Sequence, residues 1–202
     1  MNKRQSGFTL VEIAIVLVII GLLLGGVLKG QEMIANGKYK SLRNDVASYA
    51  AAFYSFQDRY KALPGDMAAA NAQAQVNAAA PGGNGNGQIT VGGTCSAAAD
   101  ESCMLWQHLR YANLIPGDPT LTGTNANPTT SYGTPVQGIY YATLGGRTGN
   151  WIVLQNLTMD VAQRLDRDMD DGTANTGTVV CTAGCAGGAY PATGTVTVAS
   201  ML

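Results

Sequence analysis

A single carboxylate, Glu12, lies inside an apolar run that extends from Phe8 to Leu28. A run of this length is enough for one helix to cross the hydrocarbon core of a bilayer, which takes about 20 residues. A carboxylate within such a span costs roughly 2.5–3.5 kcal/mol on insertion scales. Glu12 is therefore expected to have a partner and a function.

The residues before this run are basic and then small. Lys3 and Arg4 are followed by Gly7, which stands directly before Phe8. An ordinary secretory signal has a shorter apolar core, and its cleavage site follows that core. Here the only junction of this type precedes the core. A plain signal anchor would explain the hydrophobicity but neither Glu12 nor the Gly7-Phe8 junction.

The arrangement Gly7-Phe8-Thr9-Leu10-Val11-Glu12, followed by a hydrophobic helix, resembles the class III signal of type IV pilins and type II secretion pseudopilins. The resemblance implies that a prepilin peptidase cuts between Gly7 and Phe8 and methylates the new amine of Phe8. It also implies that Glu12 pairs with the Phe8 amine of a neighbouring subunit during filament assembly. Each buried charge would then remove the other's desolvation penalty only when the subunits are in register.

The resemblance divides the chain into a leader (1–7), a membrane or filament-core helix (8–28), the amphipathic half of that helix (29–60) and a periplasmic or extracellular head (61–202). It implies a single-pass precursor in the bacterial inner membrane. The implied partners are the peptidase, other pilin or pseudopilin subunits, an inner-membrane assembly platform and the lipid bilayer. The alternative function is a membrane-anchored periplasmic binding or adhesive module that does not assemble into a filament.

A helical stripe continues beyond the apolar run. Apolar residues recur at spacings of four and three, which is the period of a helix with one buried face. They are Leu42, Val46, Tyr49, Phe53, Phe56 and Tyr60. One continuous helix from Phe8 to about Tyr60 is therefore predicted, with its first half apolar all round and its second half amphipathic.

The remaining segments predict an α+β head, in which a small antiparallel sheet packs on the amphipathic half of the long helix. The expected elements are an Ala-rich helix over 67–80 with Asp66 as its N-cap, a loop at 81–87 without packing contacts, a helix over 100–114 that buries Leu105, Leu109 and Ala112, strands over 138–144 and 151–154 joined by a hairpin at 145–149, a helix over 158–169, and strands over 176–181 and 194–199. This matches the pilin fold. The segments 60–66, 105–117 and 165–179 also resemble a subgroup of prepilin-type proteins with Pro-Gly-Asp and Asp-Asp-Gly signatures.

Four cysteines lie in the head. An even number of cysteines in an exported domain indicates disulfides, and four cysteines allow three pairings. We favour Cys95–Cys103 and Cys181–Cys185, because each pair closes a short local loop. A zinc site is disfavoured, since His108 is the only histidine available to complete it.

Four acidic residues close together suggest a calcium site. Asp166, Asp168, Asp170 and Asp171 precede Gly172, but an EF-hand loop requires glycine in the sixth position and glutamate in the twelfth, where this chain has Asp171 and Gly177. We expect a solvated helix end with a turn, and no cofactor, with calcium as the alternative.

The sequence contains no catalytic arrangement, so an enzyme is not expected. Its serines and aspartates follow no nucleophile-elbow motif, and its glycine-rich loops lack the lysine and helix of a phosphate-binding loop. The formal net charge is −1, which argues against a nucleic-acid-binding face.

Overall fold

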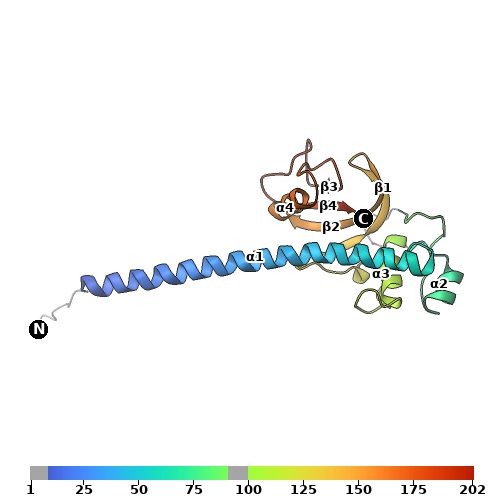
Figure 1. Ribbon diagram of the computed structural model, residues 1–202, viewed down its shortest axis with the longest axis horizontal. Helices are drawn as coiled ribbons and strands as arrows, with labels where there is room; N and C mark the ends of the chain where they lie inside the picture. Colours follow the sequence, from blue (N-terminus) through green and yellow to red (C-terminus); the bar gives the residue numbers. More distant parts are fainter. Residues whose placement is uncertain (1–8, 91–99) are drawn as a thin grey trace, which may run out of the picture. The chain divides into compact units, whose positions relative to one another are not determined.

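The computed structural model describes residues 9–90 and 100–202. The chain divides into two compact units, one ending at Lys40 and one beginning at Ser41. The first element, α1 (Leu10–Tyr60), is an uninterrupted helix of 51 residues (Figure 1). It confirms the predicted long helix, and the glycines at 21, 25, 26, 30 and 37 do not break it.

The remaining elements form an α+β fold with a small sheet. In chain order they are α2 (Ala69–Gln75), α3 (Glu101–Tyr111), η1 (Gly123–Ala126), β1 (Val136–Leu144), β2 (Arg147–Thr158), α4 (Met159–Met169), β3 (Val179–Ala183) and β4 (Thr195–Met201). The sheet is antiparallel and four-stranded, in the order β1-β2-β4-β3 (Figure 1). The predicted fold class is confirmed.

In the first unit, α1 exposes its apolar side chains. From Leu10 to Leu28 every large hydrophobic side chain is exposed, and the most apolar stretch of the helix has a mean hydropathy of 2.8. By length and composition this segment can cross a membrane. Burial of its side chains therefore requires a lipid or protein environment that the isolated chain does not supply.

In the second unit, the last part of α1 lies in the core of the head. Leu42, Phe53 and Phe56 are fully buried, as the predicted stripe requires. The helix contacts α3 through an edge-to-face pair of Tyr49 and Trp106, whose ring centroids are 5.2 Å apart. The helical stripe is thus the surface on which the head packs.

The hairpin between β1 and β2 is tighter than predicted. Only Gly145 and Gly146 connect the strands, with φ values of 54° and 78°. Two consecutive positive φ values are the requirement of a type I′ turn, whose twist matches that of the flanking strands. The segment 147–149 therefore belongs to β2. Likewise β3 begins at Val179 rather than at residue 176.

Two predictions for the segment after α1 are wrong. Asp66 does not cap α2, whose N-cap is Ala68 and has no side-chain hydrogen bond. Instead the two carboxylate oxygens of Asp66 accept hydrogen bonds from the backbone N–H groups of Asn86 and Gly87, both at 2.9 Å. The helix is also shorter than predicted. Asp66 was misassigned because its partners lie about twenty residues further along the chain.

The second wrong prediction concerns the glycine-rich loop at 81–87, which is packed rather than free. A Cβ on Gly82 would lie 2.1 Å from Ala69 Cα, and one on Gly83 would lie 2.2 Å from Gly65 O. Glycine is needed at these positions because the backbone passes too close for a side chain. The loop is thus a fixed part of the head.

Candidate functional site

Glu12 takes part in a reciprocal hydrogen-bonded cap at the first turn of α1. Its Oε2 atom accepts hydrogen bonds from the backbone N–H and the hydroxyl of Thr9, both at 2.8 Å. The Glu12 N–H in turn donates to Thr9 Oγ1 at 3.2 Å. This is a capping box, which satisfies two of the backbone donors left without helical partners. The Thr-x-x-Glu spacing is visible in the sequence, yet our sequence analysis did not use it.

The capping box fixes where the carboxylate lies. It places the negative charge at the positive end of the helix dipole. It also places that charge at Thr9, the residue that follows the predicted new N-terminus in the chain. Gly7 and Phe8 lie outside the described residues, so cleavage between them and pairing of Glu12 with a methylated amine remain predictions.

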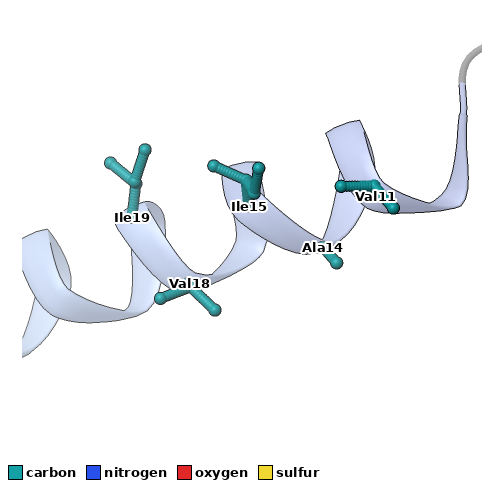
Figure 2. Close-up of a pocket in the computed structure, with 5 residues that line it drawn as sticks. All are labelled: Val11, Ala14, Ile15, Val18 and Ile19. Carbon is teal, nitrogen blue, oxygen red and sulfur yellow. The ribbon is translucent and has the colours of Figure 1, made fainter.

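The helix surface next to Glu12 is wholly apolar. Figure 2 shows Val11, Ala14, Ile15, Val18 and Ile19 on successive turns of α1. These side chains line a shallow hollow of about 300 Å³. Spacings of three and four residues place these side chains along one side of the helix. Such a surface suits lipid chains or a second apolar helix.

Three of the four predicted calcium ligands come together at the end of α4. Asp166, Asp170 and Asp171 each offer an oxygen within 4.8 Å of the others, whereas Asp168 is not part of this group. Asp166 is buried, against the expectation for this residue, whereas Asp168 and Asp171 are exposed, as expected of a solvated helix end. Burial raises the pKa of its carboxyl group.

Protein donors already occupy these carboxylates. Asp166 accepts hydrogen bonds from the Tyr190 hydroxyl at 2.8 Å and from the Gly172 N–H at 3.1 Å. Asp170 accepts from the backbone N–H groups of Thr178 and Val179. Burial and the hydrogen bond to Asp166 raise the pKa of Tyr190 far above its usual range, which keeps the hydroxyl protonated as the donor. The cluster thus ties α4 to β3 and to the segment before β4.

We expect chelation of calcium to leave the melting temperature of the protein unchanged. The reason is that three carboxylates, already hydrogen-bonded, fall short of the six to eight oxygen ligands that Ca²⁺ takes. The measurement is thermal unfolding with excess EDTA and then with excess CaCl₂. A rise in melting temperature with CaCl₂ that is absent in Asp171→Asn would contradict this expectation.

The structure confirms one predicted disulfide. Cys181 and Cys185 are bonded, with their Cα atoms 6.2 Å apart. Cys181 lies within β3, and Cys185 lies two residues beyond the end of that strand. Cys103 is also disulfide-bonded, but Cys95 lies outside the described residues. The Cys95–Cys103 pairing therefore remains a prediction.

A buried histidine connects three segments of the head. His108 on α3 is fully buried and stacks on Phe56 of α1, with ring centroids 5.7 Å apart. Its Nδ1 accepts a hydrogen bond from the Gly65 N–H at 2.8 Å, so its Nε2 carries the proton and donates to Pro81 O at 2.7 Å. Burial lowers the pKa of His108, which keeps the ring neutral. The role of His108 is structural.

Glu101 on the same helix holds the glycine-rich loop from the other side. Its Oε1 accepts a hydrogen bond from the Asn84 N–H at 2.9 Å, and its Oε2 accepts one from the Thr90 N–H at 2.7 Å. Together with Asp66 and His108 it forms what we call the loop clamp: three buried side chains that fasten residues 81–90. The loop clamp was not predicted, because its three members are far apart in the chain.

Comparison with known proteins identifies the N-terminal segment. Residues 2–28 match the family model for the prokaryotic N-terminal methylation motif. No curated protein and no solved structure matches the chain. This motif is the signal of type IV pilins and pseudopilins, and it indicates a type IV pilin-like or pseudopilin precursor.

Proposed function

We propose that this chain is a structural subunit, a pilin, minor pilin or pseudopilin, of a type IV pilus or a type II secretion-like filament. Prepilin peptidase cuts it at Gly7-Phe8, and the apolar half of α1 moves from the inner membrane into the filament core. Glu12 then pairs with the N-terminal amine of a neighbouring subunit. The role is structural and not enzymatic, as is usual for proteins with this motif.

The observation that carries the proposal is the position of Glu12. Its carboxylate is fixed at the first turn of α1, within the methylation motif. The large hydrophobic side chains of this part of the helix are all exposed. A charge in this environment needs a counter-charge to be stable. The amine that cleavage would create lies one residue before Thr9.

Apolar helices bundled in a filament would also bury the exposed apolar side chains of Figure 2. In the precursor, lipid chains would cover the same side chains. Because both environments are apolar, moving the helix from the membrane into the filament changes the free energy of apolar burial only slightly. The pairing of Glu12 with the neighbouring amine can then decide the register between subunits.

Shearing of the native cells tests the proposal. A filament subunit is expected in the sheared or periplasmic filament fraction, as polymers that pellet at high speed and contain the processed chain. A chain that stays entirely in the membrane as a monomer would favour the alternative, a membrane-anchored binding or adhesive module.

A further inference from the structure

The residue that directly follows α1 has an unusual backbone conformation. Lys61 has a φ of 54°, in the left-handed region. Two other non-glycine residues in the described part of the chain have positive φ values, and both are asparagine, which tolerates this region. A helix that ends in this way normally uses glycine there. Lysine is strained at this position, and strain of this kind concentrates at functional sites.

Lys61 lies where two surface hollows meet. One hollow has a volume of about 480 Å³ and is lined by Leu63, Asn71 and Asn84 in addition to Lys61. The second has a volume of about 390 Å³ and is lined by Tyr54 and Asp58. Gln57 and Lys61 line both hollows. The two hollows therefore form one continuous surface, and Lys61 lies at its centre.

The walls of this surface are firmly held. On one side they are the last turns of α1. On the other side Asn84, Gly85 and Gly87 belong to the loop that the loop clamp fastens. A site whose walls are already ordered loses little conformational entropy when it binds a ligand. The clamp thus prepares this surface before any ligand arrives.

The chemistry of the walls defines the class of ligand. The side chains of Gln57 and Asn71 are exposed, and each amide group can donate and accept hydrogen bonds at once. A hydroxyl group also does both. The Asn84 amide is held within the loop, where its oxygen accepts from the Asn86 N–H and its nitrogen donates to the Thr90 hydroxyl. The Lys61 ammonium lies 2.8 Å from the Asp58 carboxylate, so these two charges cancel at the centre of the surface. A polyanion would therefore gain no electrostatic attraction there.

An aromatic ring completes the surface. Tyr54 is 49% exposed, so part of its ring is available to the C–H groups of a sugar. We propose that the surface around Lys61 binds a neutral, hydroxyl-rich ligand, namely a saccharide chain. The Lys61 ammonium donates one hydrogen bond to Asp58, which leaves two N–H donors for this ligand. This use of the lysine side chain explains why lysine stands at a backbone position that favours glycine. This binding does not depend on filament assembly.

The test uses the full chain in lauryldimethylamine oxide, a detergent without a sugar headgroup. Saturation-transfer NMR is measured with cellohexaose, maltohexaose, chitohexaose and mannohexaose, and separately with heparin hexasaccharide as an anionic probe. At least one neutral hexasaccharide is expected to bind. Lys61→Gly is expected to weaken that binding at least about tenfold while leaving the melting temperature equal or higher, because glycine relieves the strain.

Asn113→Gly is the matched control, because Asn113 has a φ of 56° just after α3 and does not line the surface. It is expected to keep full binding, and Gln57→Ala to lose part of it. The proposal is overturned if no neutral hexasaccharide binds at millimolar concentration, if heparin hexasaccharide alone binds, or if Lys61→Gly binds as well as the unmodified protein.

Discussion

Replacement of Glu12 by alanine is expected to give a subunit that inserts into the membrane and is processed but does not enter filaments. Removal of one partner of a buried charge pair costs about 3–5 kcal/mol, which corresponds to a more than hundredfold loss of affinity at each subunit contact. Insertion of the helix is expected to become easier, since an intramembrane carboxylate is lost. The measurement is the ratio of filament to membrane-bound subunit in sheared cells.

A second variant separates the charge of Glu12 from its capping role. Thr9→Val removes the hydroxyl that exchanges hydrogen bonds with Glu12 but leaves the carboxylate in place. The loss of an N-cap costs about 1 kcal/mol of helix stability, so filaments are expected to form at a level near normal. If Thr9→Val abolishes filaments as completely as Glu12→Ala, then capping rather than charge pairing is the requirement.

The second large effect is expected at His108. His108→Ala leaves the Gly65 N–H and the Pro81 carbonyl without partners and opens a cavity beside Phe56. Unsatisfied buried groups cost about 1–3 kcal/mol, and cavities in a core add to that. We expect the free energy of unfolding to fall by about 3 kcal/mol, measured by urea denaturation at pH 7.5.

The same residue gives stability a defined pH dependence. The pKa of His108 is lowered in the folded protein, so the unfolded chain binds the proton more readily. Its contribution to stability is therefore fully present above the unfolded pKa of about 6.5 and is lost as the pH falls from there toward the folded pKa. Protonation would also place an N–H on Nδ1, facing the Gly65 N–H.

His108→Gln is the control, because an amide donates and accepts hydrogen bonds but does not titrate. Asp166, whose pKa is raised, gains relative stability as the pH falls, and this contribution is the same in both proteins. The difference in unfolding free energy between the two proteins isolates His108, the single histidine of the chain. A difference that stays constant between pH 7.5 and pH 5 would refute the assignment.

The parts of the structure that the sequence could predict are those with local signals. The period of 3.6 residues between Leu42 and Phe56 was sufficient to place the second half of α1. The strands and α4 were found from β-branched runs and helical spacing, with errors of a few residues at their ends. A disulfide between Cys181 and Cys185 was also visible, because both cysteines lie in one short segment.

The parts that sequence reasoning missed depend on partners far apart in the chain. Asp66 resembled a helix cap because such carboxylates accept N–H groups, and only the fold shows that its donors are at residues 86 and 87. Asp166 looked solvated, but Tyr190 and Gly172 cover it. The glycines at 82 and 83 were predicted to lie in a loop without packing contacts, whereas they allow two backbone segments to touch.

Processing at Gly7-Phe8 separates a prepilin from a plain membrane anchor. It can be measured by intact mass and N-terminal sequencing of the protein from its native membrane, with and without prepilin peptidase. We expect loss of residues 1–7 and a methylated Phe8 as the first residue, only where the peptidase is present. An uncut chain that retains Met1 in cells with an active peptidase would contradict it.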